Sequence, residues 1–171
     1  MGSSSPLRAI LRGAFAGAVG VAVMDAVLYG RYRRGGGDSP PIEWGFGGDS
    51  NWEAVSAPAQ VGRRLYEGFR QRELPARRAR LTNNVMHWGY GIGWATAYGI
   101  LAGTFDRPRL IWGPAFGASV WLSSYVLMPL AGLYKPIWEY DALTLWKDLT
   151  PHLAYGTTVA GVFRVLTSGR R

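Results

Sequence analysis

Four stretches of this chain are apolar and long enough to cross a lipid bilayer, and each is bounded by charge, proline or glycine. At a rise of ~1.5 Å per residue, a helix over each stretch covers about 27 to 32 Å, which matches the hydrocarbon thickness of a bilayer. Because backbone polar groups inside lipid must bond to one another, the stretches predict helices. We therefore expect an all-α fold, an integral membrane four-helix bundle forming a single membrane domain over residues 1–171. The predicted spans are residues 13–30, 84–103, 110–130 and 149–166.

A polar, arginine-rich surface segment over residues 31–81 separates the first two predicted spans. The run of glycine, aspartate, serine and proline at 35–41 predicts a loop. Over residues 51–74 an apolar stripe returns beside a charged face, which predicts an interfacial amphipathic helix between spans one and two. The alternative is a solvated helix packed on the end of the bundle, because Pro58 interrupts the stripe. The stripe consists of Trp52, Val55, Ala59, Leu65 and Phe69.

The net charge is +8, from 19 basic and 11 acidic residues. In a soluble protein this excess would suggest nucleic-acid binding, but most of the basic residues flank the predicted spans. Arginines at span ends anchor a protein to anionic headgroups, so the expected partner is the lipid bilayer and not nucleic acid. The basic residues near both termini stand in very short segments, which favours a multi-pass protein of the inner (plasma) membrane with both termini cytoplasmic.

Asp25 is the acidic residue that lies within a predicted span. A carboxylate inside a bilayer costs at least ~2.5 to 3.5 kcal/mol unless it is paired, hydrated or protonated. Both histidines of the chain, His87 and His152, lie at about the same depth, near the start of the second and fourth spans. We therefore expect a polar cluster that locks the helices together by hydrogen bonds. Its predicted members are Asp25, His87, His152, Tyr90, Tyr155 and Asn84.

Two other interpretations of this cluster stay open. Imidazoles beside a carboxylate exchange protons near neutral pH, so Asp25, His87 and His152 would suit a proton-responsive or small-solute-handling protein. Alternatively, His87 and His152 would ligate a haem or a metal ion between the second and fourth spans, where glycine-rich faces leave room. Two histidines without further ligands are a small set, so we expect no metal site and no cofactor.

Small residues recur at a spacing of four along the predicted spans. In lipid, such pairs let helix backbones approach closely, where apolar burial alone gives little drive to association. They predict a tightly packed bundle or a face for a homo-oligomer or another membrane protein. The predicted helix-packing pairs are Gly13 with Gly17, Gly89 with Gly93, Gly99 with Gly103, and Gly113 with Gly117.

The second half of the chain repeats the first in outline. The second span opens with His87, Tyr90 and Gly91, and the fourth opens with His152, Tyr155 and Gly156 at the same spacing. Such a duplication predicts two halves of the same orientation, related by an axis along the membrane normal. The alternative is a chance echo in aromatic, glycine-rich sequence.

Residues 128–133 read Met-Pro-Leu-Ala-Gly-Leu, followed by an acidic loop with proline and tryptophan and then by a polar approach to His152. This order of features resembles the YagU-like family of small bacterial inner-membrane proteins, from the His87 helix to the end of the chain. The resemblance implies a bacterial, multi-helix protein of the inner membrane. It implies no established biochemical activity.

The sequence shows no hydrolytic signature and no glycine-rich phosphate loop, and it has no cysteine for thiolate chemistry. We therefore expect no enzyme and no catalytic residue. The predicted function is a non-enzymatic membrane protein with a structural or accessory role, which assembles with itself or with another membrane complex.

Overall fold

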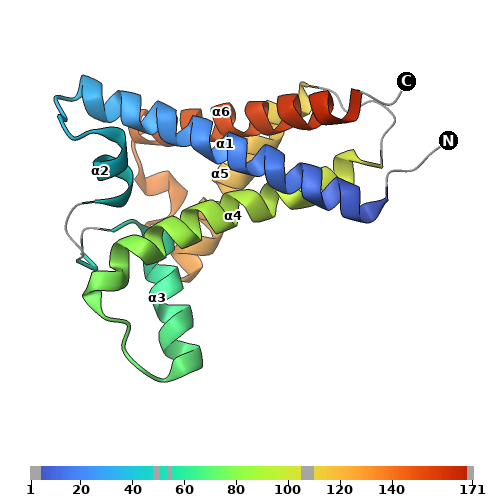
Figure 1. Ribbon diagram of the computed structural model, residues 1–171. Coiled ribbons are helices and arrows are strands. Elements are labelled where there is room, and N and C mark those ends of the chain that lie inside the picture. Colours follow the sequence, from blue (N-terminus) through green and yellow to red (C-terminus); the bar gives the residue numbers. More distant parts are fainter. Residues whose placement is uncertain (1–4, 48–50, 54, 105–109, 169–171) are drawn as a thin grey trace.

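The computed structural model describes residues 5–47, 51–53, 55–104 and 110–168. Over these residues the chain forms six α-helices and two short 3-10 turns, and no strand occurs among them. The all-α class predicted from the sequence is therefore confirmed. The long helices in Figure 1 are α1 (Pro6–Arg34), α4 (Ala79–Ala102), α5 (Trp112–Leu130) and α6 (Ala142–Ser168). The short helices are α2 (Pro41–Phe46) and α3 (Ala57–Arg70), and the 3-10 turns are Ala76–Arg78 and Ile137–Glu139.

The fourth long helix starts earlier than predicted, at Ala142 instead of residue 149. Asp141 accounts for this start, because its carboxylate accepts hydrogen bonds from the Thr144 backbone N–H at 2.9 Å and from the Thr144 hydroxyl at 2.6 Å. These bonds satisfy a free N–H of the first helical turn, as an N-cap does. The segment before the predicted span is thus part of α6.

One helix in the described part of the chain, α1, qualifies as a membrane span by length and hydropathy. The core helix of a soluble protein or a signal sequence passes the same test. Hydropathy therefore supports one span, where the apolar stretches predict four. The other three helices fall short because glycine, tyrosine, tryptophan, serine and threonine dilute their leucine, isoleucine and valine.

The long helices form a bundle in which α1 packs against both α4 and α6, and α5 packs against α6. In Figure 1, α1 runs opposite in direction to α4 and α6. The start of α1 and the end of α6 therefore lie together, at what we call the terminal end. The end of α1 and the start of α4 lie at the opposite end, the loop end, where α3 projects across the direction of the bundle.

Glycine lets the paired helices approach to backbone contact. A Cβ atom on Gly13 would lie 2.6 Å from the carbonyl oxygen of Ala95, and one on Gly99 would lie 2.7 Å from that of Ala9. In the second pair, a Cβ atom on Gly113 would lie 2.8 Å from the carbonyl oxygen of Gly156. Real Cβ contacts are not this short, so α1 with α4 and α5 with α6 require glycine at these positions.

The predicted pair Gly89 and Gly93 has a different setting. Both residues are exposed, and a Cβ atom on either would meet nothing within 4 Å. The close contact of α4 with α1 instead involves Gly91, where a Cβ atom would overlap the side chain of Val21. Gly103, the partner predicted for Gly99, follows the last residue of α4 as its C-cap.

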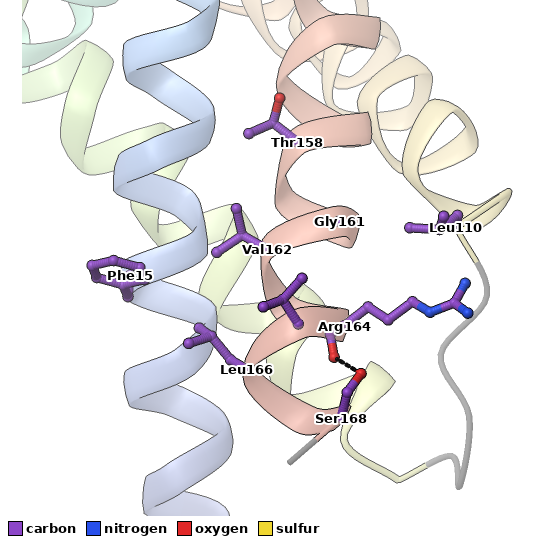
Figure 2. A pocket seen from close by; sticks show the side chains of 9 residues that line it. Phe15, Leu110, Thr158, Gly161, Val162, Arg164, Leu166 and Ser168 are labelled. Carbon is purple, nitrogen blue, oxygen red and sulfur yellow. Dashed lines mark hydrogen bonds between the residues drawn. The ribbon is translucent and has the colours of Figure 1, made fainter.

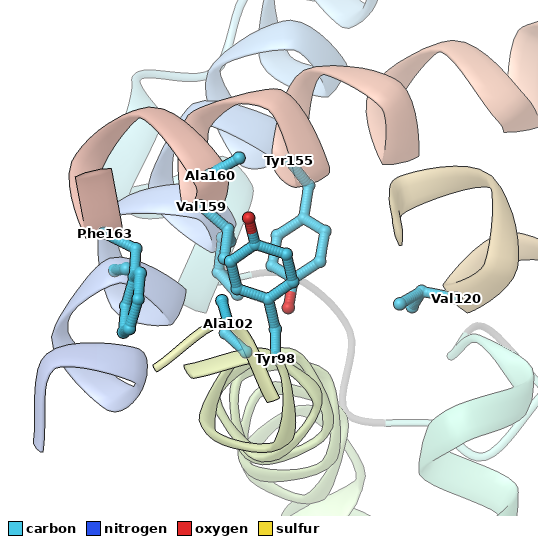
Figure 3. Packing of buried hydrophobic residues seen from close by; sticks show 10 residues of the cluster. Tyr98, Ala102, Val120, Tyr155, Val159, Ala160 and Phe163 are labelled. Carbon is cyan, nitrogen blue, oxygen red and sulfur yellow. The ribbon is translucent and has the colours of Figure 1, made fainter. Parts of the chain in front are cut away.

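The buried core lies between the long helices and is aromatic between α4, α5 and α6. Tyr98 of α4 packs against Phe116 of α5, with ring centroids 4.8 Å apart, and against Phe163 of α6, at 5.9 Å. Figure 3 shows Tyr98 beside Tyr155 of α6. Aromatic side chains thus join α4 to α5 where the two backbones are not in close contact.

The surface segment forms a small second core at the loop end. Trp52 is buried with Ala59 and Ala79, and its indole N–H donates to the carbonyl of Leu74 at 3.1 Å. The helix predicted over residues 51–74 spans only Ala57–Arg70, so Trp52 and Val55 of the predicted stripe lie before it. Pro58 thus interrupts the stripe, as predicted, but does not break the helix. It lies in the first turn of α3, where a missing N–H costs no helical hydrogen bond.

Candidate functional site

The central polar contact of the bundle joins α1 to α4. His87 Nε2 and Asp25 Oδ1 lie 2.8 Å apart, and the two side chains are 26% and 28% exposed. The pair follows the seam of close packing set by Gly17 and Gly91. Beyond these glycines, α1 and α4 meet through Asp25 and His87, and each of these side chains is the hydrogen-bond partner of the other.

His152 lies near this pair but bonds within its own helix. Its Nδ1 is 2.8 Å from the carbonyl oxygen of Asp148, and because a carbonyl only accepts, Nδ1 is assigned the hydrogen. His152 also interacts electrostatically with His87 and with the Asp148 carboxylate. The imidazole of His152 is therefore a neighbour of the Asp25 and His87 pair and not a hydrogen-bonding member of it.

The other three residues predicted for the cluster form hydrogen bonds elsewhere. The hydroxyl of Tyr155 donates to the carbonyl of Gly91, and that of Tyr90 lies 2.8 Å from the Ser123 hydroxyl. The Asn84 amide donates to the carbonyl of Gly45, in α2, at 3.1 Å. Each of these bonds ties two elements together, but none reaches Asp25.

Sequence reasoning missed a second acidic centre, at Asp148 of α6. The hydroxyl of Tyr125, from α5, donates to Asp148 Oδ2 at 3.0 Å. The ring of Tyr125 packs against Tyr134 and Tyr140, with centroid distances of 5.6 and 5.4 Å. Burial raises the pKa of Tyr134, and the nearby Asp148 carboxylate raises it further.

A signal for this centre was present in the sequence. Tyr125 follows Gly113 at the same distance at which Asp25 follows Gly13. An alignment of the two halves on their first glycines would have paired Tyr125 with Asp25 and suggested a polar partner for it on α6.

Arg31 closes the loop end of the contact between α1 and α6. Pro151 lies inside α6 and has no N–H, so the carbonyl of Lys147, four residues earlier, receives no backbone hydrogen bond from it. The Arg31 guanidinium donates hydrogen bonds to this carbonyl and to the Thr150 hydroxyl. A cation of α1 therefore fills the gap that a proline leaves in α6.

The arrangement of His87 and His152 gives little support to the interpretation that they ligate a haem. His87 already uses Nε2 toward Asp25. Gly89 and Gly93 do not open space beside the histidines, because they lie on the exposed side of α4. In the described part of the chain, no group of three or more histidine, aspartate or glutamate side chains could hold a metal ion.

Comparison of the chain with known protein families, with curated proteins and with solved structures finds no match. The resemblance to the YagU-like family therefore stays a prediction from the sequence.

Proposed function

We propose that the chain is a multi-pass integral membrane protein of the bacterial inner membrane, with a structural or accessory role and no catalytic activity. In this proposal α1, α4, α5 and α6 are the four spans, and α3 lies along the membrane interface. The observation that carries it is the burial pattern of the long helices.

The long helices bury alanine, valine and aromatic side chains, and they expose many of their leucines and isoleucines. Ala16 and Ala95 are fully buried, whereas Leu101, Leu130 and Val165 are 67%, 81% and 74% exposed. In a water-soluble protein large aliphatic side chains are the ones most often buried. The reverse pattern is expected where lipid covers the outside and close backbone contact holds the helices.

The polar segments agree with this orientation. α3 projects across the bundle direction at the loop end, so it would lie in the plane of the interface. Its side chains Leu65 and Phe69 are 51% and 86% exposed, and Arg64 and Arg70 lie near them on the same helix. Aliphatic and aromatic side chains would then enter the headgroup region while the arginines bind phosphates.

The accessory role is supported by the outer face of α4. Gly89, Gly93 and Ala97 follow one another at a spacing of four, and all are exposed. Val85 and Leu101 continue the same line at 60% and 67% exposure. This small-residue face has no partner among the described helices and suits a helix of a second copy or of another membrane complex.

Single-cysteine crosslinking tests the assembly, because the chain has no native cysteine. We expect Gly93→Cys to form a crosslinked species in membranes, to a second copy or to a partner chain. Gly161→Cys is the matched control, since Gly161 also has open space around it but lies on α6. Native mass spectrometry in mild detergent identifies the partner. Equal crosslinking of both variants, or of neither, would contradict assembly through α4.

A second candidate function is favoured by the Asp25 and His87 contact. An imidazole that gains a proton turns this hydrogen bond into an ion pair, and His152 and Asp148 stand beside it. Such a group can respond to protons near neutral pH. If the contact is only structural, Asp25→Asn lowers thermal stability at every pH. If it is a proton switch, Asp25→Asn folds normally but loses the pH dependence of its thermal unfolding.

A further inference from the structure

The outer face of α6 holds a groove of about 620 Å³ at the terminal end of the bundle. Figure 2 shows Phe15 of α1 on one side of it and Leu110 on the other, with Gly161 of α6 between them. A Cβ atom on Gly161 would meet nothing within 4 Å, so this glycine leaves the floor open. The groove is thus a long apolar channel along a helix.

The length of the groove matches one leaflet of a bilayer. Its lining runs along α6 from Thr158 to Ser168, ten residues of helix. At ~1.5 Å per residue this is about 15 Å, half of a hydrocarbon core of about 30 Å. Between these limits the lining is mainly apolar, and Phe15 and Val165 are 57% and 74% exposed. An extended acyl chain has the shape and polarity to lie there.

The headgroup end of the groove carries a positive charge without an acidic partner. Arg164 lines the groove, and neither ion pair found among the described residues involves it. Among the described residues, the terminal end carries Arg8, Arg12 and Arg164 and no acidic residue. A headgroup with negative charge would be attracted to this end.

A second arginine nearby has one nitrogen without a hydrogen-bond partner among the described residues. Arg12 precedes Phe15 by three positions on α1, so the two lie on neighbouring parts of one helix face. Its Nη1 atom is buried and has no hydrogen-bond partner among the described residues. Buried donors are normally satisfied, so this nitrogen is a free donor at the terminal end.

We propose that this groove binds an anionic phospholipid, with the phosphate over the last turn of α6, between Arg164 and Ser168, and one acyl chain extended along α6 past Gly161 to Thr158. The inference rests on the proposed membrane location and adds to it a specific, charge-selective lipid site. The shape of the groove selects an acyl chain, and Arg164 selects the charge of the headgroup.

The test uses the full chain, purified in mild detergent and stripped of lipid. It is titrated with dioleoyl phosphatidylglycerol or with dioleoyl phosphatidylcholine, and native mass spectrometry reports the first bound lipid. We expect the anionic lipid to bind about fivefold more tightly than the zwitterionic one. Equal affinity for the two lipids would overturn the proposal.

Three variants locate the site. Arg164→Gln should remove the preference for phosphatidylglycerol and leave binding of phosphatidylcholine unchanged. Arg8→Gln is the matched control, because Arg8 lies at the same end but does not line the groove, and it should retain the preference. Gly161→Leu should fill the floor and weaken the first binding step for both lipids. A similar loss in Arg164→Gln and Arg8→Gln would overturn the proposal in favour of diffuse attraction.

Failure of the groove and failure of the membrane location give different results. Extraction of native membranes with alkaline carbonate reports the location: a membrane-embedded chain stays in the pellet, and a soluble or peripheral one is released. A pellet-bound chain without lipid preference overturns only the lipid site. A released chain overturns the proposed function.

Discussion

The two halves of the bundle use the same packing scheme with different polar contacts. In the first half, α1 presents Gly13 and Gly17 to α4, and in the second half α5 presents Gly113 and Gly117 to α6. Asp25 and Tyr125 occupy the same place after these glycines. The frame of both halves is therefore a glycine-lined, antiparallel helix pair, as the repeated histidine motif suggests.

The acidic residue of the polar contact lies on the glycine-bearing helix in the first half and on its partner helix in the second. In the first half the acid is Asp25 on the glycine helix, and it bonds to His87 on the partner helix. In the second half the glycine helix supplies Tyr125, and the acid is Asp148 on the partner. His152, the counterpart of His87, turns to the carbonyl of Asp148. The comparison indicates that the packing is shared, and that among these residues the hydrogen bond between an acid and a histidine side chain belongs to the first half.

The largest expected effect separates Gly117 from Gly17, which lie at matching positions of the two helix pairs. A Cβ atom on Gly117 would overlap the backbone carbonyl of His152, whereas one on Gly17 would meet the Cβ atom of Ala95 at 2.7 Å. Gly117→Ala should therefore lower the free energy of unfolding by about 3 kcal/mol, and Gly17→Ala by about 1 kcal/mol. Thermal unfolding in detergent measures both.

Gly93→Ala is the control for both glycine variants, because its neighbourhood is open and stability should not fall. Equal losses in Gly117→Ala and Gly17→Ala would contradict the closer approach of the neighbouring helix at Gly117.

The next effect concerns the acid and histidine contact. Asp25→Asn and His87→Gln should each lower the free energy of unfolding by about 1 to 2 kcal/mol, since the pair is only partly buried. In a double-mutant cycle the two changes should show a coupling of about 1 kcal/mol. Additive losses would mean that the contact does not join α1 to α4.

A smaller loss is expected from the matching position in the second half. Tyr125→Phe removes the hydrogen bond to Asp148 and should lower the free energy of unfolding by about 1 kcal/mol. Tyr66→Phe on α3 is the control, because Tyr66 is 39% exposed and should tolerate the change. If Tyr125→Phe did not change the free energy of unfolding, the hydrogen bond between Tyr125 and Asp148 would not stabilise the second half.

The smallest expected effect concerns the stability of the first turn of α6 at low pH, compared with the first turn of α4. The Thr144 hydroxyl, and then its backbone N–H, hold the pKa of Asp141 below its ordinary value of 3.8. Because the folded-state pKa is lowered, the carboxylate adds stability above pH 3.8, and this is lost as the pH falls through the lowered value. Acidification from about pH 5 to about pH 2 should loosen the first turn of α6.

Hydrogen exchange at the first turn of α6 measures this loosening. Asp141→Asn keeps the cap but cannot titrate, so its exchange should stay the same on acidification. α4 begins after Arg78 without a side-chain cap, and its first turn serves as the internal control. Equal acid sensitivity at the starts of α4 and α6 would contradict the role of Asp141.

The long helices could be predicted from the apolar stretches, but their rotation could not. Gly89 with Gly93 and Gly91 with Ala95 have the same spacing on α4, so spacing alone does not tell which pair meets α1. The depth of Asp25 and His87 was predictable from the helical rise. Their hydrogen bond depends on the rotation of each helix about its axis.

Other features of the fold depend on local contacts that the pattern of apolar stretches does not reveal. The early start of α6 depends on the bonds between Asp141 and Thr144. Pro58 was expected to interrupt the apolar stripe, and α3 does begin only at Ala57, with this proline in its first turn. The bond of Arg31 to the carbonyl of Lys147 follows from Pro151 only once α1 and α6 are known to be neighbours.

Water accessibility of the outer apolar face distinguishes helices covered by lipid from helices covered by water. In this cysteine-free chain, Val126→Cys and Leu101→Cys place a thiol on exposed apolar faces of α5 and α4, and Arg70→Cys places one on the polar segment. Intact membranes are treated with a membrane-impermeant maleimide from both sides. The account predicts that Arg70→Cys is labelled, and that Val126→Cys and Leu101→Cys are labelled only after denaturation. Labelling of all three at similar rates would mean that water, and not lipid, covers these helices.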